Sequence, residues 1–320
     1  MPKESVLKEP VLKEPVLKEP VLKESVLKES DFQPFTFENI HIPEAYLRAY
    51  PKDHSEYSLV TILSWEHYSP CRFAVYKNHL VIECLYQGER SVYAPVGIPD
   101  KEVFCDTVFY AKSSGASFHL YDESDVRMFQ DCFPETPLEE VRGYFEYCWD
   151  TKTLAELPGK RFVGIRGQIH QFRRRFSCTT EPVAPENLEE VRTLIHAWYA
   201  EKTPAKGSAV SDELKAADIS LDHFSALHLE GLLMRVEGAP AAVSIWENRN
   251  SDVCLVHYEK GLLAYPGIYK VINQETAKLL SGRYRVLNRE GDMDEAGLRE
   301  AKMRYHPEFF IKAYSVNLSE

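Results

Sequence analysis

Residues 287–307 concentrate the side chains that could do acid–base chemistry. The segment reads LNREGDMDEAGLREAKMRYHP, and we predict a helix within it from about Gly297 to Tyr305. Leu298, Ala301 and Tyr305 fall on one helical stripe, and Lys302 lies at the edge of that stripe. A charge beside an apolar stripe is costly unless it is paired and hydrogen-bonded. We therefore expect an anionic partner for Lys302.

Three acids at the ends of predicted strands are the candidates for that partner. Glu290 and Asp292 end or follow a strand predicted at 284–290, and Glu259 lies near the end of a strand predicted at 252–260. If these strands are neighbours in one sheet, Glu259 and Glu290 lie close together. We predict that Glu290 is a general base or recognises an amine, and that Lys302 stabilises an oxyanion or a phosphate. Glu259 is the third catalytic candidate, and the alternative is a structural ion-pair network that locks the helix to the sheet.

The neighbouring side chains are expected to bind a substrate. These residues are Asn288, Arg289, Asp292, His257, Lys260, Gly267, Tyr269, Arg299 and Tyr305. A coenzyme A pyrophosphate would need a glycine-rich turn whose backbone amides open a helix. The turn KGLLAYPGIYK has only Gly261 and Gly267, and Pro266 removes one amide. This argues against acetyl-CoA as the donor, although the amides after Gly267 could still bind a phosphate or a carboxylate.

Composition narrows the class of protein. The chain has 320 residues, 44% of them hydrophobic, which is enough for two domains with large cores. Its net charge of −11 argues against general coating of nucleic acid and against DNA as a partner. No apolar run reaches the roughly 18 residues of a membrane span, and no metal-binding motif is present. The seven cysteines form no C-x-x-C pair and no signal peptide follows Met1, so we expect reduced thiols and a cytoplasmic protein.

Residues 1–30 differ from the rest of the chain because VLKEP or VLKES recurs there. A proline inside a helix costs roughly 3 kcal/mol, so the regularly spaced prolines predict a disordered tail rather than a helix. We predict an N-terminal lobe at 31–158 and a C-terminal lobe at 159–320, because Pro158-Gly159 would break any preceding helix and marks residues 150–160 as a junction.

Turn residues and hydrophobic periodicity predict the elements of both lobes. The first lobe has short helices within 35–51 and 56–68, a hairpin at 73–86 turning at Lys77-Asn78, a strand at 117–122 and a helix at 137–150. The second has helices at 161–176 and 186–202, a hairpin at 229–248 turning at Glu237-Gly238, a strand at 252–260, a helix at 267–280, a strand at 284–290, the helix near 297–305 and a strand at 309–318. This order of the second lobe is that of the GNAT acyltransferase fold.

Four sequence blocks carry a family resemblance. FQPFTFENI with EYSLVTILSW, LPGKRFVGIRGQIHQF, HYEKG with GIYKVINQETA, and NREGDMDEAGLREAKMRYHP resemble blocks of the phosphatidylglycerol lysyltransferase C-terminal-domain family over residues 31–316. The resemblance implies an α+β chain with two GNAT-like lobes, each a mixed sheet flanked by helices. It also implies an acyltransferase that uses aminoacyl-tRNA as its donor and needs no other cofactor. The acceptor would be a small molecule, a peptide or a lipid headgroup.

A tRNA donor would need a basic surface for its phosphates. Six cations without an intervening acid occupy residues 160–175, namely Lys160, Arg161, Arg166, Arg173, Arg174 and Arg175. We predict that they bind tRNA, and the alternative is a solvated helix face. Two other functions stay open at this point: an acetyl-CoA-dependent N-acetyltransferase, and a non-catalytic module of the same fold that binds tRNA or another ligand.

Overall fold

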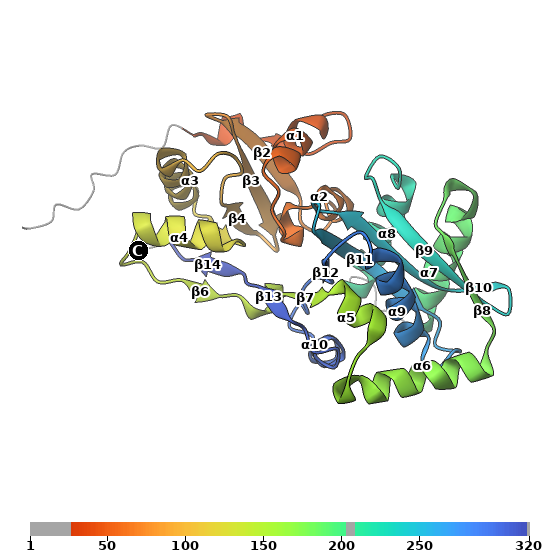
Figure 1. Cartoon of the computed structure of the whole chain (residues 1–320). Helices are drawn as coiled ribbons and strands as arrows, with labels where there is room; N and C mark the ends of the chain where they lie inside the picture. The colour runs from red at the N-terminus through yellow and green to blue at the C-terminus, as the bar shows by residue number, and fades with distance from the viewer. Residues whose placement is uncertain (1–26, 203–208, 319–320) are drawn as a thin grey trace, which may run out of the picture.

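Two seven-stranded mixed sheets form the protein, in a computed structural model that describes residues 27–202 and 209–318 (Figure 1). The first sheet has the order β1 (Gln33–Pro34), β2 (Cys71–Tyr76), β3 (His79–Tyr86), β4 (Glu89–Tyr93), β5 (Ser117–Leu120), β14 (Tyr314–Val316) and β6 (Glu139–Glu140). The second has the order β13 (Phe309–Ile311), β7 (Glu146–Asp150), β12 (Val286–Asn288), β11 (Val253–Gly261), β10 (Ala239–Asn248), β9 (Glu230–Val236) and β8 (Cys178–Pro182). Each sheet has one parallel pair, β4 with β5 and β11 with β12, so the predicted α+β class with two mixed sheets is confirmed.

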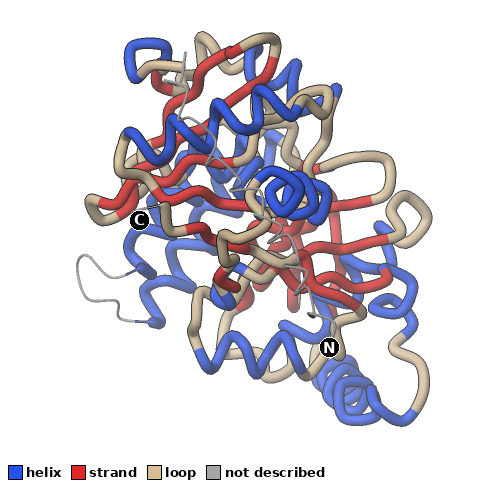
Figure 2. Tube along the Cα trace, turned by 90° about the vertical axis from the view of Figure 1, so that its left-hand side faces the viewer, coloured by secondary structure: helices blue, strands red, loops and turns tan. Residues whose placement is uncertain are grey.

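Helices flank the strands, as the view turned by 90° shows (Figure 2). The helices up to residue 175 are α1 (His41–Ala49), α2 (Leu59–Ser64), α3 (Lys101–Ser113), α4 (Glu123–Cys132), α5 (Thr151–Glu156) and α6 (Val163–Arg175). The others are α7 (Leu188–Lys202), α8 (Ala209–Asp222), α9 (Ile268–Leu280) and α10 (Ala296–Met303). The sequence analysis assigned no element to β1, β4, β8, α3, α4, α5 or α8.

Both predicted hairpins are confirmed. Lys77 and Asn78 join β2 to β3 with φ values of 44° and 60°, and Glu237 and Gly238 join β9 to β10 with φ values of 51° and 84°. Two successive residues with positive φ form the tight turn whose twist matches that of the flanking strands. The turn residues therefore set the register of both hairpins.

The helix predicted at 137–150 is wrong. That segment contains β6, a 3-10 turn and β7, and β7 pairs with β12 and β13 of the second sheet. Along β7, Tyr147 and Trp149 pack in one core cluster while Cys148 packs in another, which is the alternation of a strand. Pairing with distant strands outweighs the helix-like spacing of the apolar residues.

The strand predicted at 309–318 is two strands in different sheets. β13 pairs with β7 in the second sheet, and β14 pairs with β5 and β6 in the first. Two segments, 139–150 and 309–316, therefore each contribute a strand to both sheets. The lobe boundary between 158 and 159 stays a prediction, whereas the sheets themselves exchange strands across it.

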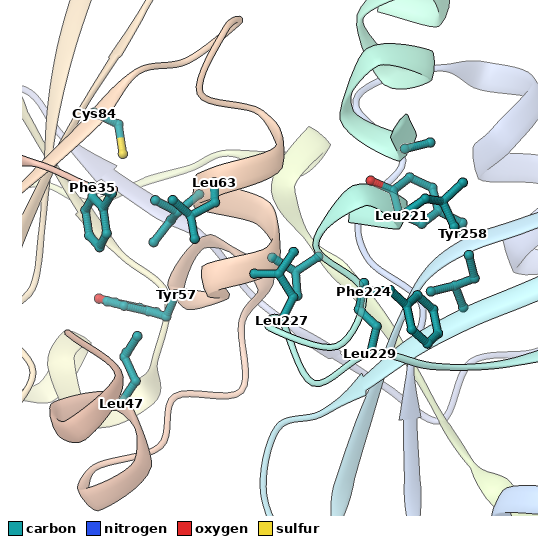
Figure 3. Close-up of a cluster of buried hydrophobic side chains, with 14 of the residues drawn as sticks. Phe35, Leu47, Tyr57, Leu63, Cys84, Leu221, Phe224, Leu227, Leu229 and Tyr258 are labelled. Carbon is teal, nitrogen blue, oxygen red and sulfur yellow. The ribbon is translucent and has the colours of Figure 1, made fainter. Parts of the chain in front are cut away.

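One hydrophobic cluster joins the two halves of the fold. Leu63 of α2 lies in the same buried cluster as Leu221 of α8, Leu227 and Tyr258 of β11 (Figure 3). A hydrogen bond of 2.7 Å between the hydroxyls of Ser64 and Ser220 crosses the same contact. The residues that face each other across this junction are therefore held in a defined arrangement.

The described fold starts before the expected boundary at residue 31. Leu27 is only 3% exposed and belongs to the core cluster of the first sheet. Glu29 forms ion pairs with Arg72 at 3.0 Å and with Arg90 at 3.2 Å. The last residues of the predicted tail thus pack on the sheet, whereas residues 1–26 lie outside the described part.

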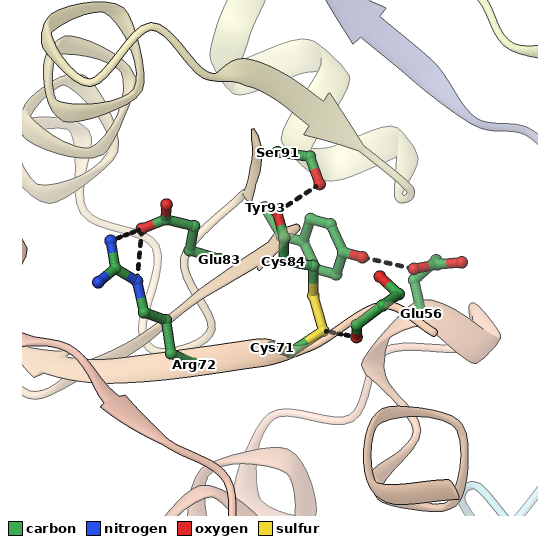
Figure 4. Close-up of a disulfide and its surroundings, with 8 residues drawn as sticks. Glu56, Cys71, Arg72, Glu83, Cys84, Ser91 and Tyr93 are labelled. Atoms are coloured by element: carbon green, nitrogen blue, oxygen red, sulfur yellow. Dashed lines mark hydrogen bonds and ion pairs between the residues drawn. A yellow bond between two sulfur atoms is a disulfide. The ribbon is translucent and has the colours of Figure 1, made fainter. Parts of the chain in front are cut away.

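The expectation that all cysteines are reduced thiols is wrong for one pair. Cys71 of β2 and Cys84 of β3 form a disulfide (Figure 4). The two residues are direct partners in the antiparallel ladder, with their Cα atoms 4.0 Å apart. The hairpin register, which the sequence does not show until the turn is placed, brings these two thiols together.

Candidate active site

The turn that follows β12, residues 288–292, is the centre of the site, and we call it the Glu290 turn. Glu290 has a φ of 58°, which is uncommon for a residue other than glycine. Gly291 lies so close to the neighbouring backbone that a Cβ there would stand 2.7 Å from the carbonyl oxygen of Gly143. The turn is therefore tightly packed and is held in a conformation that needs support.

Lys302 of α10 provides that support. Its ammonium donates hydrogen bonds to the carbonyl oxygens of Arg289 at 2.7 Å, Glu290 at 3.0 Å and Gly291. The side chain is buried, with the residue 9% exposed, and burial lowers the pKa of Lys302 to about 8 despite the nearby charge of Glu290. Three successive carbonyl oxygens thus hold the lysine over the turn.

The structure corrects two expectations about this lysine. No carboxylate of the described residues forms an ion pair with Lys302, because backbone carbonyls occupy its donors. Lys302 is also the one buried residue of α10, whereas Leu298 is 37% exposed. The stripe that faces the fold is therefore centred on the lysine and not on the leucine.

Glu290 forms one end of a line of charged groups. Its Oε1 atom lies 2.8 Å from Nδ1 of His257 on β11, and Nε2 of that imidazole lies 3.4 Å from Oε1 of Glu247 on β10. Arg249 lies 3.3 Å from the same oxygen of Glu247. The side chain of His257 is 4% exposed and that of Glu290 is 32% exposed, so only the Glu290 end opens to solvent.

Electrostatics fix the protonation of this line. Burial alone would lower the pKa of His257, but its close contacts with the carboxylates of Glu247 and Glu290 outweigh it and raise the pKa to about 9. Burial opposes ionisation of Glu247 as well, yet Arg249 and His257 hold its pKa at about 2. At neutral pH the imidazole is therefore a cation between two carboxylates. The Oε2 atom of Glu290 has no hydrogen-bond partner within residues 27–202 and 209–318.

Glu259 and Glu290 lie at the ends of adjacent parallel strands, as expected, but they have different cationic partners. Arg289 donates to Glu259 at 2.7 Å, and Asn273 of α9 donates to it at 3.3 Å. The guanidinium of Arg289 lies 5.6 Å from the ring centroids of both Trp149 and Tyr305. Glu259 is therefore a neutralised, largely buried partner of Arg289.

Asp292 and Arg299 anchor the far side of the Glu290 turn. Asp292 is fully buried and accepts two hydrogen bonds of 2.8 Å from Arg299, one of 3.1 Å from Arg142 and one from Tyr147. Burial would raise the pKa of Asp292, but these partners hold it at about 2. This part of the predicted site is the ion-pair network that the sequence analysis kept as the alternative.

Residues of the N-terminal half complete the surroundings. Glu146 of β7 accepts a hydrogen bond from the backbone N–H of Ser55 at 2.9 Å and one from the amide of Asn288. Glu56 accepts a hydrogen bond from Tyr93 (Figure 4), and burial raises its pKa, with the charges of Glu146 and Glu290 adding to that effect. Glu56 is therefore close enough to Glu290 for the two charges to interact across the junction.

Three predicted substrate-binding residues lie in a second group near the start of α9. Lys260 pairs with Glu213 at 2.7 Å and lies over the ring of Trp198, whose indole N–H donates to Tyr269. Gly267 precedes α9 with a φ of 94° and borders a small cavity of about 140 Å³ that Tyr269 also lines. The structure therefore does not bring these three residues to Glu290.

The six cations of residues 160–175 fall into two groups, those with partners in the fold and those without. Arg166 donates to the carbonyl oxygens of Leu157 and Gly159, and Arg173 pairs with Glu275. The other four cations are exposed and have no carboxylate partner among the described residues; they are Lys160 and Arg161 before α6, and Arg174 and Arg175 at its end. A free pair of cations thus stands at each end of the helix, and the two central arginines hold structure.

Sequence reasoning missed four acids and bases of the site. Glu247 lies in a buried strand, and a lone acid among apolar residues was a signal that could have identified it. Glu146 also lies in a buried strand, but it fell in the segment that was wrongly predicted as a helix. Glu56 lies in a 3-10 helix (Ser55–Tyr57) at the start of a predicted helical segment, Arg249 follows the end of β10, and neither was singled out from the sequence. Among the described residues no group of three or more His, Cys, Asp or Glu side chains could hold a metal ion, and no helix is long and apolar enough to cross a membrane.

Comparisons with known proteins found solved structures that resemble the whole chain. A conserved protein of unknown function from Bacteroides thetaiotaomicron VPI-5482 has 26% sequence identity and a TM-score of 0.81, over 89% of this chain and 98% of that chain. L-PGS from Bacillus licheniformis has 16% identity and a TM-score of 0.59, over 88% of this chain and 92% of that one. FemX has 9% identity and a TM-score of 0.56, over 90% of this chain and 97% of that one.

The likenesses to L-PGS and FemX, both below 25% identity, show the fold alone. No curated protein sequence matches the chain. The model of the family described as phosphatidylglycerol lysyltransferase, C-terminal, matches residues 47–317, which include both sheets apart from β1 and the whole site around Glu290. The chain therefore belongs to the phosphatidylglycerol lysyltransferase C-terminal family.

Proposed function

We propose that this protein transfers an aminoacyl group from aminoacyl-tRNA to an amine acceptor, with Glu290 as the general base. The observation that carries the proposal is the half-open carboxylate of Glu290, whose Oε1 is held by a buried His257 and whose Oε2 has no partner in the described chain. A carboxylate oriented in this way can accept the proton that an attacking amine loses. The membership in a family named for lysyl transfer supports this reaction class.

His257 orients the base and is not the base itself. With a pKa of about 9, the imidazole already carries its proton at neutral pH and cannot take another. Its charged hydrogen bond to Oε1 restricts the rotation of the Glu290 carboxylate. Glu247 and Arg249 support the imidazole from the buried side.

Lys302 is proposed to position Glu290 rather than to stabilise an oxyanion. An ammonium has three N–H donors, and three carbonyl oxygens occupy them. No donor is left for a substrate oxygen or a phosphate. The lysine instead holds the left-handed backbone of the turn that presents Glu290.

The charges at the junction favour an amine acceptor over a neutral hydroxyl. Neither Glu56 nor Glu290 has a lysine or arginine partner among the described residues. Glu290 and Glu247 share the single charge of His257, and Glu56 has no ion-pair partner in the described chain, so this side of the junction attracts an ammonium group and disfavours an anionic one. The four free cations at the ends of α6 are the candidates for contacts with the tRNA phosphates.

The test is a donor-discharge assay. Total tRNA charged with radioactive amino acids is incubated with the purified protein and a pool of small amines, and the label is followed into new products. We expect transfer by the wild type and by Glu295→Gln, an exposed glutamate on the same segment without a side-chain capping bond, but none by Glu290→Gln. Binding of tRNA without transfer would support the non-catalytic module, and binding of coenzyme A without tRNA would support the acetyltransferase.

A further inference from the structure

A second pair of cysteines lies in the N-terminal half, away from the Glu290 turn and from the disulfide of the β2–β3 hairpin. Cys105 lies in the second turn of α3, and Cys132 is the last residue of α4. Both are half-buried free cysteines. Their neighbours show how the two helices meet.

Contacts on both sides bring the two thiols together. Lys101, four residues before Cys105, donates to the carbonyl oxygen of Asp131 at 3.2 Å. Phe109, four residues after Cys105, has its ring centroid 6.0 Å from that of Phe133 in an edge-to-face contact. Residues 101, 105 and 109 follow one side of a helix, because i and i+4 positions are neighbours. The end of α4 therefore runs along this side of α3, and Cys105 and Cys132 are neighbours where the two helices meet.

We propose that Cys105 and Cys132 are a reversible disulfide site that a small-molecule disulfide, such as oxidised glutathione, closes. One thiolate attacks a sulfur of the oxidant, which forms a mixed disulfide and releases one thiol. The second cysteine then attacks the protein sulfur of that mixed disulfide, the protein disulfide forms and the second thiol leaves. The protein loses two protons and two electrons, and the oxidant gains both.

The chain makes this reaction selective for one pair. Of the remaining free cysteines, Cys148 and Cys254 are buried, and Cys178 is half-buried beside Arg173 and Glu275 rather than beside a thiol. Cys105 and Cys132 are half-buried neighbours where α3 meets α4, so closing the bond needs little movement. Burial and the neighbouring thiol raise the pKa of Cys105 to about 12, so closure should be slow at neutral pH and faster at pH 9.

The closed bond would tie α3 to α4 across a loop of the chain. A disulfide between residues 105 and 132 restricts the conformations of the unfolded chain, and we expect it to raise the melting temperature by several degrees. The same bond would leave the Glu290 turn untouched, because none of its residues belongs to these two helices. The proposal is therefore independent of the proposed transfer reaction.

The experiment counts thiols and maps the bond. The wild type is incubated with millimolar oxidised glutathione at pH 9, and its thiols are titrated after denaturation. We expect the five free thiols to fall to three, a single peptide pair linked through Cys105 and Cys132, and reversal by dithiothreitol. Cys178→Ser serves as the control and should form the same link with the same rise in melting temperature.

Cys105→Ser and Cys132→Ser are tested separately, so that failure of one variant to fold does not end the test. Each should keep its remaining thiol or carry a single glutathione, with no rise in melting temperature. Glutathione on both cysteines of the wild type, or no loss of thiols at pH 9, would overturn the proposal.

Discussion

Replacing Glu290 with Gln tests the electrostatic line from Glu290 to Glu247. The pKa of His257 is about 9 against an ordinary value of 6.5, and a shift of that size corresponds to roughly 3 kcal/mol. Glu290 is the nearer of the two carboxylates, at 2.8 Å against 3.4 Å for Glu247, but it is also the more exposed. Solvent screening reduces its share, so we assign about half of the shift to each. The pKa of His257 should therefore fall by about one unit in the variant.

The sign of the pH dependence follows from the raised pKa. A group whose pKa is raised by folding stabilises the folded state fully below its unfolded value, near pH 6.5, and this contribution is lost as the pH rises through about 9. The free energy of unfolding of Glu290→Gln should thus be lower than that of the wild type by roughly 1 kcal/mol at pH 6. The gap should close above pH 9, where the imidazole is neutral in both proteins.

Two measurements check this prediction. Titration of the His257 ring proton by NMR gives the pKa directly, and urea unfolding at pH 6 and pH 9.5 gives the gap in stability. Glu295→Gln, which lies outside the line, should change neither. An unchanged His257 pKa in Glu290→Gln, or a stability gap that does not depend on pH, would refute the assignment of Glu290 as the partner of the imidazole.

Three further predictions concern other parts of the chain. Lys302→Met leaves three carbonyl oxygens without their donor, at about 1–3 kcal/mol each, and this loss exceeds the gain from removing a buried charge. We expect the melting temperature to fall by several degrees in thermal melts and kcat for transfer to fall at least about tenfold. Replacing Arg174 and Arg175 with Gln should weaken tRNA binding and reduce its salt slope by about one per residue, whereas Arg173→Gln, which breaks the pair with Glu275, should lower stability instead; equal effects on binding would contradict this division. Deleting residues 1–30 should lower the melting temperature by several degrees relative to deleting 1–26, because only the longer deletion removes the buried Leu27, and equal melts would mean that its packing contributes nothing.

Local signals predicted the local structure well. The two hairpins follow from turn residues that tolerate positive φ, and α6, α7 and α9 follow from apolar residues at helical spacing. The failure at 137–150 has the opposite origin, since β7 is a strand because of partners more than a hundred residues away in β12 and β13. Long-range pairing leaves little trace in the apolar spacing of a short segment.

The site could be predicted only in part for a related reason. Placing Glu259 and Glu290 at adjacent strand ends required only the order of the strands, and that inference agrees with the structure. Their different partners depend on the direction in which each side chain points. The positive φ of Glu290 changes that direction in the Glu290 turn, and the sequence does not show it. The N-terminal contributors Glu56 and Glu146 depend on how the two sheets exchange strands, which the sequence analysis did not anticipate.

The hydrogen bonds that hold Lys302 also determine how the carboxylate of Glu290 is presented. An ion pair between the two would have neutralised the carboxylate and occupied its oxygens. The carbonyl oxygens of the turn satisfy the ammonium instead, so the cation stabilises the backbone conformation while the carboxylate keeps one oxygen free. A lysine that is buried for this purpose loses three bonds when it is replaced by an apolar side chain, and the residue that it presents loses its orientation. Structural and positioning roles are thus combined in one side chain. The loss of stability expected in Lys302→Met must therefore be compared with Glu290→Gln, which we expect to lose transfer while it still folds.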